Sequence, residues 1–381
     1  MTRRTIGKSR WFADIPSYLK MRMKYNSSSE NIISDMTTME VPSTDSVWGL
    51  DPVAAEKFAI STSSSALDFD FKYSFLDPAH QSMSPSEQFN FYGVLNLLLT
   101  NIPQSDSSGL YGGVLGHNLK SLTDYNGAGI TDMRFLLHSS DGLFRLEQLD
   151  TSEAIVNYSS NVPEYDGYSL WNINGWSASV SSLPTTGLGL KISSGYHFME
   201  QDNAQKEVQI GGITLGRWFE PEHSFDLQAT IIKENDGIKR TRTVGGNTIT
   251  NVNYLGSESW GDLPAWTLQK AEGVNYMPVS QTGRRSWKVS LSYIQDDNMF
   301  SKHNNENQFF SYDPETESNT FDSSFGSFMG LTFDGQIPFL FCPDYNADDK
   351  EFAKCVITNK PTFKQVANNL FSTSLVLTEV F

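Results

Sequence analysis

The sequence predicts a mainly β protein, and three of its features support this prediction. Apolar and polar residues alternate over Gly283 to Ile294, which is the pattern of a strand with one buried face. Aromatic residues make up 13% of the chain, and glycine, serine, threonine and asparagine are frequent, as in β proteins. Short turn sequences such as Gly245-Gly246-Asn247 are typical of β-hairpins.

Residues 1–52 are expected to form a basic N-terminal arm followed by a linker. Seven lysines and arginines in the first 24 residues face a single acid, Asp14. Aromatic and aliphatic residues from Trp11 to Leu19 have nearly helical spacing, which predicts a short docked helix in the arm. Arg3, Arg4 and Arg10 are candidate contacts to an acidic neighbour, and a solvated terminus is the alternative.

Residues 53–204 are expected to form a β-rich domain with one helix. Strict alternation over Leu67 to Phe75 predicts a half-buried strand. Ser84, Pro85 and Glu87 form the start of a capping box, and a wide apolar arc follows them. These signals predict the helix near residues 85–100.

Four aromatic residues stand among glycines, serines and asparagines between 160 and 200. Such rings can form a stacking surface for a glycan, or they can pack against the edge of a sandwich, and the sequence leaves both readings open. The four residues are Tyr165, Tyr168, Trp171 and Trp176.

Residues 205–381 are expected to form a C-terminal β-sandwich or barrel module. Its organising strand places Trp287, Val289, Leu291 and Tyr293 on the buried face, because a shift of one residue would expose all four. Later apolar segments up to Phe381 are expected to pair with this strand.

Arg284 and Arg285 stand at the start of the organising strand. They are candidate contacts to an acidic neighbour, because guanidinium groups pair well with desolvated carboxylates. Two charges that face water at the end of a strand are the alternative.

Net charge and cysteine content limit the possible functions. The chain carries a net charge of −16, and removing the +6 of the first 24 residues leaves −22 for the remainder. An acidic body argues against general nucleic-acid binding.

Cys342 and Cys355 are expected to be buried reduced thiols. The absence of an apolar run of about 18 residues predicts no membrane span.

No enzyme or cofactor motif is present in the sequence. The six histidines lack the spacing of a zinc site, and neither a G-x-S-x-G elbow nor a phosphate-binding loop occurs. The acidic turn from Asp344 to Glu351 could hold calcium or remain a solvated turn. A carboxylate pair drawn from Asp166, Glu200 and Glu258 is the one remaining catalytic hypothesis.

The C-terminal half carries several short motifs in a fixed order. They are Gly283 to Tyr293, Pro338 to Asp344, Gln365 to Asn369, and the end of the chain from Leu375 to Phe381. An upstream segment from Leu215 to Leu227 belongs to the same series. In these motifs the chain resembles bacteriophage tail and baseplate structural proteins, although the acidic insertion after Asn298 and the final Phe381 depart from their pattern.

This resemblance implies a β module that packs into rings, as distal tail proteins do, with no catalysis. The expected function is therefore that of a non-enzymatic virion structural protein of the tail, baseplate or head-to-tail region. It would assemble with itself as a homo-oligomeric ring or sleeve and with other virion proteins, in the host cytoplasm. A receptor- or glycan-binding protein of the virion is the alternative.

Overall fold

The fold is known from a computed structural model, which describes part of the chain. The described residues are 7–14, 17, 38–40, 58–59, 73–76, 89–95, 110–120, 130–139, 144–145, 150–157, 162–174, 185–194, 207–210, 212–235, 237–253, 259–260, 263–264, 283–299, 324–347 and 350–380. Most of them lie in antiparallel strands, so the predicted mainly β fold is confirmed. Among these residues, no helix is long and apolar enough to cross a membrane.

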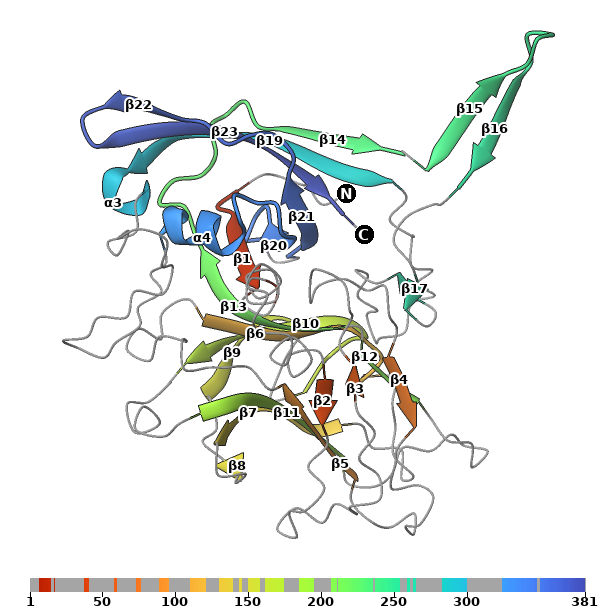
Figure 1. Cartoon of the computed structure of the whole chain (residues 1–381), viewed down its shortest axis with the longest axis vertical. Helices are drawn as coiled ribbons and strands as arrows, with labels where there is room; N and C mark the ends of the chain where they lie inside the picture. Colours follow the sequence, from red (N-terminus) through yellow and green to blue (C-terminus); the bar gives the residue numbers. More distant parts are fainter. Residues whose placement is uncertain are drawn as a thin grey trace, which may run out of the picture.

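The larger sheet has eleven strands, and its order is an open path that crosses the molecule (Figure 1). From one end to the other the path runs through β14 (Thr230–Glu234), β19 (Arg284–Gln295), β23 (Leu370–Glu379), β21 (Ala353–Ile357), β20 (Phe339–Cys342), β1 (Arg10–Asp14), β13 (Gly212–Phe219), β6 (Leu110–His117), β10 (Gly167–Asn174) and β9 (Asp150–Val156), with β22 (Phe363–Ala367) paired to β23.

Strand β19 is the predicted organising strand, and most of its predicted face is correct. Trp287, Val289 and Leu291 are buried, and β19 pairs with β23 over most of its length. The prediction was wrong for Tyr293, whose side chain is 62% exposed. The register shifts between Leu291 and Ile294, so a β-bulge turns Tyr293 outward and buries Ile294 instead.

Residues 10–14 of the N-terminal segment are part of the sheet, which corrects the expected helix for Trp11 and Phe12, whereas the rest of the expected helix lies outside the described residues except for Ser17, which is helical. Residues Arg10–Asp14 form β1, which lies between β13 and β20 and pairs with both. The side chains of Trp11 and Phe12 are fully buried. Aromatic residues at the start of the chain therefore fill the core rather than one side of a surface helix.

Trp11 is the centre of an aromatic cluster beneath this part of the sheet. Its ring stacks on Phe339 at a centroid distance of 5.8 Å and meets Phe328 edge-on at 5.3 Å. Phe328 belongs to α4 (Phe325–Leu331), a short helix that is capped by the Ser324 side chain and covers this end of the core.

The two expected domains share the larger sheet. Strands β6, β9 and β10 come from residues 53–204, whereas β13 comes from residues 205–381, and β13 pairs directly with β6. The expected boundary at residue 204 therefore does not separate the backbone hydrogen bonding of the two parts.

A six-stranded sheet lies below the β6 and β10 end of the larger one (Figure 1), which gives a sandwich-like arrangement. Its order is β3 (Phe58–Ala59), β2 (Thr38–Glu40), β5 (Phe89–Leu95), β11 (Thr185–Ser194), β7 (Ile130–Ser139) and β8 (Phe144–Arg145). Three two-stranded pairs and a short helix complete the described elements: β4 (Tyr73–Leu76) with β12 (Glu207–Ile210), β15 (Ile238–Arg242) with β16 (Thr248–Val252), β17 (Ser259–Trp260) with β18 (Leu263–Pro264), and α3 (Asp296–Met299).

Strand β5 replaces the helix expected near residues 85–100, so that prediction was wrong. All seven residues of β5 pair with β11. The segment contains two phenylalanines, a tyrosine and a valine, which favour strands, and Gly93, which disfavours a helix interior. Partner strands outweighed the capping signals at Ser84 and Glu87, which lie outside the described residues. The strand predicted over Leu67 to Phe75 is described only from Tyr73, in β4.

Candidate functional site

The histidine His117 is buried next to a serine hydroxyl. Its side chain is 1% exposed, and its Nε2 lies 2.7 Å from the Ser169 hydroxyl oxygen. Because the Leu119 N–H donates to Nδ1, the ring proton lies on Nε2 and is donated to Ser169. Burial lowers the pKa of His117 to about 3. This neutral and inaccessible pair joins β6 to β10 and is structural.

Cysteine and metal chemistry find no support among the described residues. Cys342 and Cys355 are buried free thiols, as expected, and burial raises the pKa of Cys342 to about 12. No group of three or more histidines, cysteines or acids is placed to hold a metal in the described part of the chain. In the acidic turn, the Asp344 carboxylate accepts a hydrogen bond from the Asn346 N–H. Glu351 accepts a hydrogen bond from Arg285, and Asp348 and Asp349 lie outside the described residues.

The Arg285 side chain is buried and pairs with carboxylates of its own chain, which corrects its expected role as a contact to a neighbouring subunit. Its side chain points to the same face as Trp287 and is 6% exposed. The guanidinium donates to both carboxylate oxygens of Glu379, from Nε at 3.0 Å and from Nη2 at 2.7 Å. It also donates to Glu351 at 3.3 Å. Burial lowers the pKa of Arg285, but these carboxylates outweigh it and the net pKa is raised.

Arg10 is also used within the chain. Its guanidinium lies between the rings of Trp218 and Tyr345, at 3.8 Å and 3.4 Å from their centroids, and donates to Glu220. Burial raises the pKa of Glu220, but Lys8 and Arg10 outweigh it and the net pKa is lowered. These contacts hold β1 to β13. Of the remaining predicted interface residues, Arg284 is half-buried at the start of β19, and Arg3 and Arg4 lie outside the described residues.

Two of the four aromatic residues between 160 and 200 are unavailable for the glycan-stacking surface that the sequence left open. Tyr168 is 3% exposed and Trp171 is fully buried, both on β10, so neither ring can stack on a sugar. Tyr168 packs with Phe12, Tyr111 and Phe352 in one hydrophobic cluster. Tyr165 is half-buried, and Trp176 lies outside the described residues. The alternative from the sequence, that these aromatics pack the sandwich, holds for Tyr168 and Trp171.

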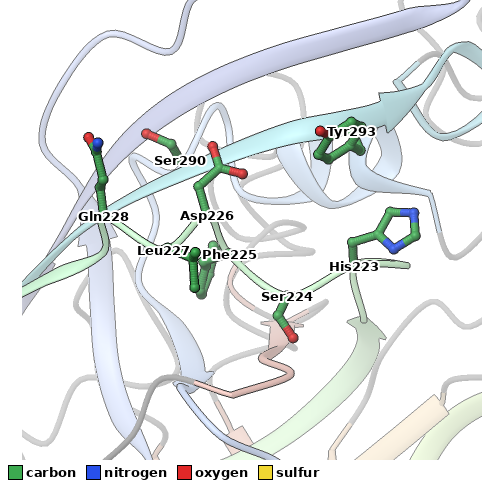
Figure 2. Close-up of a pocket in the computed structure, with 8 residues that line it drawn as sticks. All are labelled: His223, Ser224, Phe225, Asp226, Leu227, Gln228, Ser290 and Tyr293. Atoms are coloured by element: carbon green, nitrogen blue, oxygen red, sulfur yellow. The ribbon is translucent and has the colours of Figure 1, made fainter.

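An open hollow of about 800 Å³ lies where β14 begins (Figure 2). The segment between β13 and β14 forms one side of it, and Ser290 and Tyr293 of β19 form the other. Tyr293 meets the exposed His223 ring edge-on at a centroid distance of 5.9 Å. Leu227 is fully exposed, whereas Phe225 is buried against Trp11.

Asp226 holds the segment that lines the hollow in place. Its backbone N–H donates to the Ser290 carbonyl at 3.0 Å, and its carboxylate accepts a hydrogen bond from Ser292. The same segment continues into β14, which is the end strand of the larger sheet. In the part of the chain that the structure describes, no strand pairs with the outer side of β14. We call β14 and the hollow together the open edge.

The β15–β16 hairpin, residues 238–252, is almost entirely exposed. Its two strands pair with each other in a sheet of their own and extend away from the body (Figure 1). All five residues of β16 are exposed, as are four of the five in β15. We call this element the projecting hairpin.

The tip of the projecting hairpin is closed by hydrogen bonds of its own backbone. The N–H of Thr243 donates to the Asn247 carbonyl at 2.8 Å, and the N–H of Gly246 donates to the Thr243 carbonyl at 2.9 Å. Gly246 has a φ of 86°, a conformation that favours glycine. Val244 at the tip is fully exposed. The predicted hairpin turn at Gly245-Gly246-Asn247 is confirmed.

Sequence reasoning missed the side chains of the projecting hairpin as a candidate site. Lys239, Arg240 and Arg242 are its three charged residues, and none of its residues is acidic. The sequence did contain a signal for this site, because the basic run from Lys239 to Arg242 precedes a hairpin turn in a chain of negative net charge. No family model, curated protein or solved structure matches this chain, so the assignment of function rests on these residues and on the motifs of the sequence.

Proposed function

We propose that this chain is a non-enzymatic structural protein of a bacteriophage virion that assembles with copies of itself into a ring or sleeve. The projecting hairpin is the observation that carries the proposal. A two-stranded hairpin is at best marginally stable in water unless it packs against something else. The side chains of this hairpin are almost all exposed on the isolated chain, including Val244, Ile249 and Val252. Such an element is best explained as one half of an interface.

The position in a virion comes from the resemblance to tail and baseplate proteins. The motifs of that resemblance include β19, β20 and β23, which adjoin the open edge or lie within a few strands of it. Residues of these motifs, such as Trp287 and Phe341, pack in the core, so they support a module of that type rather than a reactive site. A tail, baseplate or head-to-tail location follows from the resemblance alone.

The alternative, a receptor- or glycan-binding protein, has lost its main support. Two of its four aromatic residues are buried, and a ring must be exposed to stack on a sugar. The hollow beside Tyr293 is open and offers few groups that converge on a small ligand. We therefore favour assembly.

Native mass of the purified chain tests the proposed function. Mass photometry or light scattering at several protein and salt concentrations should give a discrete oligomer at low salt. The oligomer should shrink as salt rises, because the screening length falls from about 10 Å at 0.1 M to about 3 Å at 1 M. A monomer under all of these conditions would contradict the proposal.

A further inference from the structure

We infer that the projecting hairpin of one copy binds the open edge of the next copy, so that the larger sheet continues from subunit to subunit. This inference rests on the proposed function and names the partner for each of the two surfaces. It follows from the backbone of β14, from the side chains around it and from the charge of the hairpin.

Strand β14 is the end strand of the larger sheet, and no described strand pairs with its outer side. Its Ile231 lies opposite Trp287 of β19, so both side chains point to the same face of the sheet. Trp287 is 2% exposed, whereas Ile231 is 45% exposed. The difference arises because nothing described covers the core beyond β14. A strand added there would use the free backbone groups and bury Ile231.

The hollow extends this receptor surface along β19. It lies next to the residues that precede β14, and beside Ser290 and Tyr293 of β19. The exposed side chains of Leu227 and Tyr293 contribute apolar surface to the hollow at the edge of the sheet. An apolar tip such as Val244 of another copy would bury all three side chains.

The projecting hairpin has two different faces. Because Arg240 lies opposite Thr250 and Arg242 opposite Thr248, both arginines and both threonines share one face. Lys239 and Ile249 belong to the other face. Each hairpin strand has five residues, as does β14, so either strand can pair along its whole length.

Charge favours a second copy of this chain as the partner. Subtracting the three positive charges of the hairpin from the net charge of −16 leaves −19 for the rest of the chain. The open edge itself carries the exposed Glu234 and the half-buried Asp226, with Lys233 as its basic residue. Opposite charges on two surfaces speed their association and fix their orientation.

The contact must be made between copies, because the hairpin leads away from its own open edge (Figure 1). One copy then offers its hairpin and the next copy its edge, which is a head-to-tail interface. Such an interface repeats until the rotation closes a ring, or it continues as a filament. Repetition of this contact from copy to copy would build the proposed ring.

Cross-linking of two variants, each with one added cysteine, tests this inference. Thr250→Cys places a thiol on the arginine face of the hairpin, and Ile231→Cys places one on the open edge. The native Cys342 and Cys355 can stay, because both are buried and burial raises their pKa. The oligomeric state of each variant is checked first by native mass.

A short bis-maleimide should join the two variants when they are mixed, whereas neither variant should be joined to itself. As a matched control, Val366→Cys places an exposed thiol on β22, away from the open edge. The Thr250→Cys and Ile231→Cys mixture should give at least about tenfold more cross-linked dimer than the Thr250→Cys and Val366→Cys mixture, because bound side chains meet at a high effective concentration.

Four results would overturn the inference. Cross-linking of Thr250→Cys alone would mean that hairpins pair with hairpins, and cross-linking of Ile231→Cys alone would mean that edges pair with edges. An oligomer without the mixed product would reject the inference and leave the proposed function standing. Binding of a short DNA duplex that is lost in Arg240→Glu/Arg242→Glu, with assembly unchanged, would assign the arginines to phosphate instead.

Discussion

At the scale of residues, the stability of the fold should depend strongly on the buried ion pair between Arg285, at the start of β19, and Glu379, at the end of β23. Loss of the Glu379 carboxylate leaves the buried Arg285 with only the more exposed Glu351 as a carboxylate partner, and breaking a buried pair costs about 3–5 kcal/mol. We expect Glu379→Gln to lower the free energy of unfolding by about that amount in denaturant titrations. The double variant Arg285→Met/Glu379→Leu should recover much of the loss, because an apolar pair of similar volume avoids the buried charge.

The exposed Lys288 on the same strand provides the control for this pair. Lys288→Met should change the free energy of unfolding by no more than about 0.5 kcal/mol. If Arg285→Met dissociated an oligomer and left stability unchanged, Arg285 would be an interface residue after all, as the sequence suggested.

His117 should make stability depend on pH. Burial lowers its pKa from 6.5 to about 3, so the folded chain keeps this histidine neutral while the unfolded chain protonates it below pH 6.5. The unfolded state therefore binds more protons, and stability falls as pH drops from about 6.5 toward 3. The slope reaches about 1.4 kcal/mol per pH unit at most.

Urea unfolding at pH 7 and pH 5 measures this effect. Between these pH values, the wild type should lose about 2 kcal/mol more than His117→Gln, which has no titrating group at this position. Equal losses in the two proteins would show that His117 is not held neutral by burial. The sequence could not predict this role, since His117 was one of six histidines without a recognisable spacing.

At the scale of elements, periodicity located β19 but could not locate its bulge. Tyr293 and Ile294 are both apolar enough to be buried, and the pairing with β23 decides between them. The same holds for β5, where local capping signals favoured a helix and the pairing with β11 favoured a strand. Long-range pairing is absent from a single sequence, so local preferences can give the wrong element.

The pairing of β1 with β13 depends on a glycine. A Cβ atom added at Gly216 would lie 1.8 Å from the Ala13 carbonyl oxygen, whereas one added at Gly245 in the hairpin tip would meet nothing within 4 Å. We expect Gly216→Ala to destabilise the fold by about 3 kcal/mol through forced separation of the strands. Gly245→Ala should be close to neutral, and denaturant unfolding of both variants checks the difference.

Equal stabilities of the two glycine variants would contradict the placement of β1 in the centre of the sheet. This placement is the main correction at the scale of elements, because residues 10–14 were expected in a surface arm. Trp11 and Phe12 indicated an apolar segment correctly. Their burial on both faces of a central strand could not be inferred from spacing alone.

At the scale of the whole molecule, the mainly β class followed from composition and alternation, whereas the arrangement of the strands did not. The first strand of the chain lies between β13 and β20, from distant parts of the sequence, and β6 continues the sheet across the expected domain boundary. The turn of the projecting hairpin was predictable. Its exposure was not, because exposure depends on which other elements fold against it.

The native mass of a charge-reversal variant tests the central claim, that the projecting hairpin joins copies of the chain. Arg240→Glu/Arg242→Glu reverses both arginines, and Lys360→Glu/Lys364→Glu makes the same change in charge on exposed lysines in and beside β22, away from the hairpin (Figure 1). At low salt, the wild type and the lysine variant should form the same discrete oligomer, and the arginine variant should be monomeric. An oligomer of unchanged mass in the arginine variant would contradict the account.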